Sequence, residues 1–129
     1  MALLLAGKGD AQAEHDLGLM YSMGWGVQQD FAQAAAWYQK AADQGLEASE
    51  NNLGTLYMYG SGVTTDYAKA LDLFHKAADQ GAAQAEVNLG DMYANGWGVP
   101  QDYKEAAARY RKVAVGMLTR WSRANTPHP

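Results

Sequence analysis

The sequence predicts an all-α fold, an α-α superhelix in which antiparallel helical hairpins stack into a right-handed solenoid. Three observations support this prediction: a 36-residue period that occurs three times, apolar residues at helical spacing, and glycines where turns are needed. The 129 residues are expected to form a single domain. Its three repeat units are residues 9–44, 45–80 and 81–116, and twelve positions are identical in all three.

The repeat is defined by residues that return at an offset of 36. A Leu-Gly pair, a tyrosine, a Gly-x-Gly-Val turn and an aspartate before an aromatic residue recur in every unit. Self-similarity at a fixed period of this length is typical of solenoids. The returning residues include Leu17-Gly18, Leu53-Gly54 and Leu89-Gly90; Tyr21, Tyr57 and Tyr93; and Asp30, Asp66 and Asp102.

Each unit is predicted to contain two helices. Apolar residues of the first unit recur at i, i+4, i+7 and i+8, on one helical face, as Ala13, Leu17, Met20 and Tyr21. Gly24 can end the first helix in the left-handed conformation, and Asp30 can cap the second helix. The predicted helices span residues 11–23, 31–44, 47–59, 67–80, 83–95 and 103–115.

A glycine returns inside every first helix, although glycine there costs about 1 kcal/mol relative to alanine. Its repetition at one register predicts a close approach between the paired helices. Small residues of the second helix are expected on the opposite side of that contact. The glycines are Gly18, Gly54 and Gly90, and the small residues are Ala34, Ala70 and Ala106.

The two ends are expected to differ from the units. Residues 1–8 align with the last turns of a second helix, so they are expected to be the end of a preceding helix. Residues 117–129 are expected to form a capping helix, over 117–124, followed by a loose tail. The apolar stripe that favours a C-terminal cap over the last hairpin is Met117, Leu118 and Trp121.

The repeated motif resembles the Sel1-like repeat, which is a tetratricopeptide-like helical repeat. The motif consists of Leu-Gly, Tyr, Gly-x-Gly-Val, Asp-aromatic and a helix that ends in Lys-Ala-Ala, and the resemblance covers residues 9–116. Ser49 and Val113 replace alanines of the pattern. The resemblance implies a protein-protein interaction module, an adaptor that binds a peptide segment or partner protein in a concave groove. A purely structural spacer or scaffold segment is the alternative.

Composition excludes several classes of function. The net charge of -4 opposes nucleic-acid binding, because phosphate recognition needs a basic face. The absence of cysteine removes disulfide scaffolds and thiolate metal sites. The apolar runs are too short for a membrane span, and the sequence contains no visible targeting segment, so it indicates no compartment.

The resemblance also implies a third class of function, that of a hydrolytic enzyme, so catalytic and metal-binding motifs have to be considered. Some cysteine-rich Sel1-like members are associated with penicillin binding and β-lactam hydrolysis, and such serine enzymes need Ser-x-x-Lys. No serine of this chain is followed by lysine three residues later. The histidines show no paired metal-ligand spacing, and His15 is expected to be exposed or to line a groove. No catalytic residue, metal or cofactor is therefore predicted.

Candidate contact residues are the positions that differ between the first helices of the three units. They recur at i, i+4, i+7 and i+8, which places them on one helical face, and ordinary surface variation is the alternative explanation. The first helices contain acids but no lysine or arginine, so the partner is expected to be neutral or basic with apolar anchors. The candidates are His15, Leu19, Met23, Asn51, Thr55, Met58, Tyr59, Asp91 and Asn95.

Overall fold

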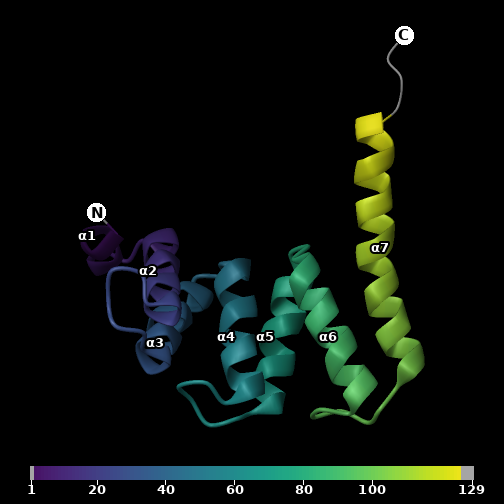
Figure 1. The fold of residues 1–129 in the computed structure, drawn as a ribbon, viewed down its shortest axis with the longest axis horizontal. Helices are drawn as coiled ribbons and strands as arrows, with labels where there is room; N and C mark the ends of the chain where they lie inside the picture. The colour runs from purple at the N-terminus through teal and green to yellow at the C-terminus, as the bar shows by residue number, and fades with distance from the viewer. Residues whose placement is uncertain (1, 126–129) are drawn as a thin grey trace.

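The computed structural model describes residues 2–125, and every regular element in that range is a helix (Figure 1). No strand occurs between residues 2 and 125, so the predicted all-α class is confirmed. The helices in chain order are α1 (Ala2–Gly7), α2 (Ala11–Met23), α3 (Phe31–Asp43), α4 (Glu47–Tyr59), α5 (Tyr67–Asp79), α6 (Ala83–Asn95) and α7 (Tyr103–Asn125).

The helices pack in the order in which they occur in the chain. Helices α2 and α3, α4 and α5, and α6 and α7 form three hairpins, and α3 and α5 also pack against the first helix of the next unit. The hairpins follow one another along the long axis of the molecule (Figure 1). This arrangement confirms the predicted solenoid, in which buried area comes from contacts between neighbours.

The predicted helix boundaries agree with the structure within one residue for α2 to α6. Asp30 caps α3, because its carboxylate accepts a hydrogen bond from the Gln33 amide at 3.1 Å. Gly24 ends α2 in the left-handed conformation, with a φ of 70°. Helices α3 and α5 each end one residue before the predicted position.

The glycine inside each first helix lies against an aromatic ring of the paired helix. A Cβ atom added to Gly54 would lie 2.6 Å from Cε1 of Phe74, which is closer than carbon atoms can pack. The same contact joins Gly18 to Tyr38 and Gly90 to Tyr110. The predicted close approach therefore exists, and the atoms nearest to each glycine belong to an aromatic ring, whereas the sequence had indicated only the small alanines.

The turn of each later unit rests on the start of the preceding second helix. A Cβ added to Gly62 would collide with the backbone of Phe31 and Ala32 at the start of α3. In the next unit the ring of Trp97 stacks on Tyr67, with ring centroids 6.3 Å apart and ring planes at 7°. These turn-to-helix contacts fix the spacing between neighbouring units.

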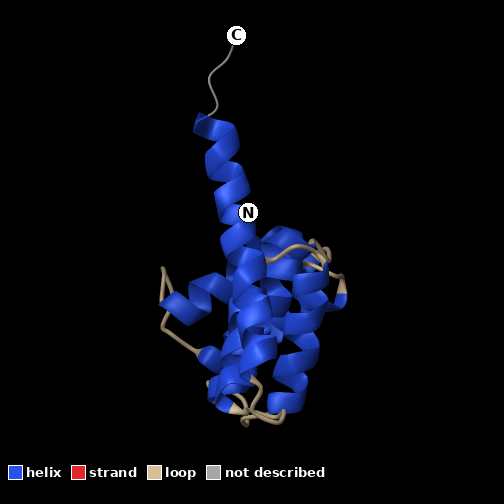
Figure 2. Ribbon diagram, turned by 90° about the vertical axis from the view of Figure 1, so that its right-hand side faces the viewer, coloured by secondary structure: helices blue, strands red, loops and turns tan. Residues whose placement is uncertain are grey.

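The C-terminal helix differs from the prediction. The sequence predicted a helix that ends at residue 115 and a separate cap over 117–124, but α7 continues without a break to Asn125. Gly116 does not adopt the positive φ that ends the first helices, so the α-helix passes through it. The second half of α7 projects beyond the other helices (Figure 2). Met117, Leu118 and Trp121 are exposed and cover no hairpin. The predicted tail after residue 125 lies outside the described residues.

Candidate binding surface on the first helices

The first helices of the three units are joined directly by polar side chains. Helix α4 contacts α6 as well as its hairpin partner α5. His15 Nδ1 lies 2.7 Å from Ser49 Oγ, which connects α2 to α4. Asn88 Nδ2 donates a hydrogen bond of 2.9 Å to Asn51 Oδ1, which connects α6 to α4. The three first helices therefore lie side by side and are linked across the units.

Three of the nine predicted contact residues are buried, which corrects the expectation that they line a groove. His15 and Asn51 are 7% and 9% exposed, because their side chains form the hydrogen bonds between first helices. Met58 is 4% exposed and packs in the core with Phe74 and Leu89. Met58 therefore stabilises the fold, and its substitution is not a test of binding alone.

The other six predicted residues reach the surface of the first helices, although to different extents. The part of the surface that they form is called the first-helix face below. The half-buried members are Leu19, Thr55 and Asp91, and the exposed members are Met23, Tyr59 and Asn95.

A shallow hollow of about 190 Å³ lies on this face between α2 and α4. Three of the candidate residues from the sequence line it: Leu19, Met23 and Thr55. Phe31 and Tyr38 from α3 line it too, and sequence reasoning missed both of them. The spacing of the first helix alone could not have found them, because they belong to the second helix of the unit.

The repeated glutamates are structural groups rather than free acids of the first-helix face. Gln44 Nε2 donates a hydrogen bond of 2.7 Å to Glu14 Oε1. One unit later, Gln80 Nε2 donates a hydrogen bond of 2.6 Å to Glu50 Oε1. Burial raises the pKa of Glu50, although the positive charge of Lys76 acts in the opposite direction. Each of these bonds ties the end of a second helix to the first helix of the same unit.

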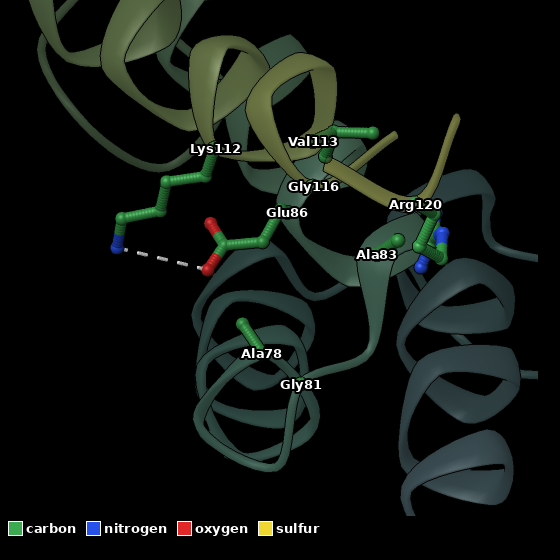
Figure 3. A pocket seen from close by; sticks show the side chains of 8 residues that line it. All are labelled: Ala78, Gly81, Ala83, Glu86, Lys112, Val113, Gly116 and Arg120. Atoms are coloured by element: carbon green, nitrogen blue, oxygen red, sulfur yellow. Dashed lines mark ion pairs between the residues drawn. The ribbon is translucent and has the colours of Figure 1, made fainter. Parts of the chain in front are cut away.

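The repeated glutamate has different partners in the third unit, because Gly116 occupies the position where the earlier units have a glutamine. Glu86 forms ion pairs with Arg109 at 3.2 Å and with Lys112 at 3.8 Å. Glu86 and Lys112 line a pocket of about 200 Å³ between the start of α6 and α7, together with Arg120 (Figure 3). No sequence motif marked this pocket.

Asp91 is also engaged within its own unit. It accepts a short hydrogen bond from the Tyr110 hydroxyl of α7. Burial, together with the hydrogen bond and charge of Asp91, raises the pKa of Tyr110 to about 12. Substitution of Asp91 would therefore disturb the α6–α7 hairpin as well as the surface. The other two acids of the first helices are Asp16 and Glu47. Between residues 2 and 125, neither forms a hydrogen bond or ion pair with a second helix.

Two further features are absent from the part of the chain between residues 2 and 125. No group of three or more histidine, aspartate or glutamate side chains in it is arranged to hold a metal ion. None of its helices combines the length and the apolar character that crossing a bilayer requires.

The fold and the repeated contacts define a helical-repeat solenoid of hairpin units. A family profile described as the Sel1 repeat matches three stretches of the chain, residues 11–46, 48–81 and 83–112. The chain therefore belongs to the Sel1 repeat family. Sel1 repeats generally serve as protein-interaction modules and are typically non-catalytic.

Solved structures agree with this assignment. One is c5321, a protective antigen present in uropathogenic Escherichia coli strains and displaying an SLR fold, at 40% identity and a TM-score of 0.82 over 92% of this chain. A Sel1 repeat protein from Oxalobacter formigenes is 39% identical, with a TM-score of 0.77 over 82% of this chain. Cysteine rich protein B (hcpB) from Helicobacter pylori is 29% identical, with a TM-score of 0.56 over 59% of this chain.

The chain spans only part of these proteins. It covers 27% of the Escherichia coli chain, 43% of the Oxalobacter chain and 57% of the Helicobacter chain. A sequence comparison with curated proteins found no significant match. The family profile establishes the family and the solved structures agree with its fold, whereas the partner must be inferred from the chain itself.

Proposed function

We propose that this chain is an adaptor that binds a peptide segment or partner protein on its first-helix face, without catalysis. The observation that carries the proposal is the position of six variable residues on one surface that runs over α2, α4 and α6. The Leu-Gly pair, the tyrosine and the turn glycines of the motif repeat between units, whereas these six positions differ. Such a pattern is expected for a surface that recognises one particular partner.

The chemistry of the face indicates the chemistry of the partner. No lysine or arginine occurs in α2, α4 or α6, while Asp16, Glu47 and Asp91 lie on them with at least part of their surface in water. Met23 and Tyr59 add exposed apolar area, and methionine adapts well to different shapes. These features favour a neutral or basic segment with apolar anchors and disfavour nucleic acid.

A structural spacer is the second candidate, and the polar bonds between units favour it. The His15–Ser49 and Asn51–Asn88 contacts, together with the stacked ring of Trp97, hold neighbouring hairpins in a fixed geometry. A spacer needs this rigidity but makes no use of Tyr59. The two candidates therefore differ in what happens when Tyr59 is changed.

The test compares two exposed tyrosines in capture experiments with the whole chain. Tyr59 lies on the first-helix face and is 65% exposed, whereas Tyr103 lies at the start of α7 and is 69% exposed. Proteins that bind through the face should be retained by the wild type and by Tyr103→Ala, but lost from Tyr59→Ala. A central aromatic anchor often contributes about 2 kcal/mol or more, so titration should show at least a roughly thirtyfold weaker complex.

Circular dichroism of both variants should match the wild type, because neither ring is buried. Partners that bind Tyr59→Ala as well as the wild type, but fail to bind Tyr103→Ala, would place the interface on the second helices. A chain that retains no partner specifically would support the spacer.

A further inference from the structure

Charge is divided unequally between α7 and the rest of the chain. Helix α7 contains six basic residues and one acidic residue, which gives it a net charge of +5. Because the whole chain carries -4, the remaining residues carry -9. Arg120 and Arg123 belong to the projecting half of α7, which contains no acidic residue. One helix of this chain therefore has the charge that the rest of the surface would attract.

The projecting half of α7 also carries an unpaired apolar stripe. Ala114, Met117, Leu118 and Trp121 follow the spacing i, i+3, i+4 and i+7, which is the pattern of a helix that binds in a groove. Met117, Leu118 and Trp121 are 58%, 69% and 65% exposed. No other helix of the described chain covers them, and the segment stands clear of the bundle (Figure 2).

The first-helix face has the complementary properties. It offers the hollow beside Leu19 and Met23 and the exposed ring of Tyr59. The carboxylates of Asp16 and Glu47 lie on the same helices, α2 and α4. A basic helix with apolar anchors is the partner chemistry already proposed for this face, and α7 supplies such a helix.

We propose that the projecting half of α7, residues 114–125, binds the first-helix face of a second copy of this chain. Trp121 and Leu118 enter the apolar area beside Tyr59, and the net positive charge of the helix offsets the negative charge of the first helices. This inference rests on the proposed function of the first-helix face and names a second copy as its partner.

The geometry favours contact between two copies over the alternatives. Helix α7 leaves the bundle as one unbroken helix, so its projecting half cannot fold back onto the face of its own chain. Direct pairing of two α7 helices would bring two charges of +5 together, which is repulsive. The acidic first-helix face is the part of a second copy that offsets this charge.

The experiment measures self-association of the whole chain by sedimentation velocity over a range of concentrations at low and high salt. A tail variant carries Leu118→Glu and Trp121→Glu, and a face variant carries Asp16→Lys and Tyr59→Ala. All four positions are exposed, so both variants should fold, which circular dichroism checks. The wild type should associate most strongly at low salt. Each variant alone should bind itself at least about tenfold more weakly, since apolar anchors dominate such contacts.

Mixing the two variants separates the proposal from a general loss of solubility or fold. The tail variant retains an intact face and the face variant retains an intact tail, so the mixture should recover a mixed complex. A wild type that stays monomeric at all concentrations would overturn the proposal, and so would a face variant that associates normally. A monomer that binds phosphatidylserine-containing vesicles through Trp121 would identify a membrane surface instead.

The same variants distinguish this inference from the proposed function. If a captured partner still requires Tyr59 while the wild type remains monomeric, the adaptor function stands and the second copy is not its ligand. If partner binding ignores Tyr59, the proposed face itself is wrong, whatever the oligomeric state.

Discussion

Helices α5 and α7 occupy the same position in successive units, yet they are buried to very different extents. Helix α5 buries Ala70, Leu73, Phe74, Ala77 and Ala78, whereas α7 buries only Ala106 among its 23 residues. Both begin with a tyrosine after a capping aspartate, and both pack against the first helix of their own hairpin. The internal hairpin contact is therefore shared, and it does not explain the difference.

The difference lies in the element that comes after each helix. Helix α5 is covered on its far side by α6, while no described helix comes after α7. Ala78 is 9% exposed, but Ala114 at the same register is exposed. A second helix of this solenoid is thus buried partly by its own unit and partly by the next one. Stability should consequently be greatest in the middle of the array and lowest at α7.

Removal of the central aromatic ring should give the largest effect and the clearest contrast. Phe74 is completely buried, so Phe74→Ala should lower the free energy of unfolding by about 3–5 kcal/mol. Tyr110 occupies the same register in α7 and is 37% exposed. Tyr110→Ala should cost on the order of 1–2 kcal/mol, because part of its ring remains in water. Urea denaturation of both variants measures the difference, and equal losses would contradict the unequal burial.

Two helical glycines should respond to alanine with opposite signs. Gly54→Ala gains helix propensity, but its Cβ would press on the Phe74 ring, so a net loss of up to about 2 kcal/mol is expected. Gly116 in α7 has nothing within 4 Å of an added Cβ. Gly116→Ala should therefore raise stability, by up to about 1 kcal/mol. Thermal unfolding of the two variants tests this contrast. Melting temperatures that shift in the same direction in both variants would contradict it.

Acid should weaken the junction between the first two units. Burial lowers the pKa of His15, although the charges of Asp16 and Glu47 act in the opposite direction. The unfolded chain titrates this ring near pH 6.5, so it binds more protons than the folded chain just below that pH. The contribution of His15 to the free energy of unfolding is therefore complete above about pH 6.5. It is lost as the pH falls through the lower pKa of the folded state.

The matched control for this prediction is His15→Asn, which places at this position the residue that unit two carries there, Asn51. The variant should lose the dependence of stability on pH in this window while retaining a polar group near Ser49. Urea titrations between pH 5 and pH 7.5 measure it. A wild-type dependence that survives in His15→Asn would assign the effect to another group.

The smallest expected difference between α5 and α7 is in the free energy of local unfolding. Beyond Gly116 the side chains of α7 contact little, so amides of its last turns should exchange with solvent at rates close to those of an unfolded chain. Amides in the middle of α5 should be protected nearly to the level of global unfolding. Hydrogen exchange with residue resolution tests this, and equal protection of both helices in a monomeric sample would contradict it.

Most of the fold could be predicted because the interactions that determine it are local or repeat exactly once per unit. Capping aspartates, turn glycines and apolar spacing located α2 to α6 within one residue. The end of α7 could not be found this way. Gly116 resembles the glycines that end second helices, but no turn or capping residue comes after it, so the helix continues.

The candidate surface was predicted less completely, since variation between units does not distinguish a surface position from an internal polar contact. Asn51 and His15 differ between units, yet both are buried, where Asn51 bonds to Asn88 and His15 bonds to Ser49. Met58 lies next to the exposed Tyr59 in sequence, but its side chain is on the buried side of α4. Only the packing of neighbouring helices separates these cases.

The seating of each turn on the preceding second helix limits how this array can grow or shrink. Gly62 fits against the start of α3, and Gly98 fits in the same way against Tyr67 at the start of α5. Removal of residues 45–80 would bring Gly98 to the place that Gly62 occupies, with the same small residue at the junction. Removal of any fraction of a unit would leave a side chain where only a glycine fits. Insertions and deletions in this lineage should therefore come in whole hairpins, and gene-level duplication rather than gradual lengthening is the route open to it.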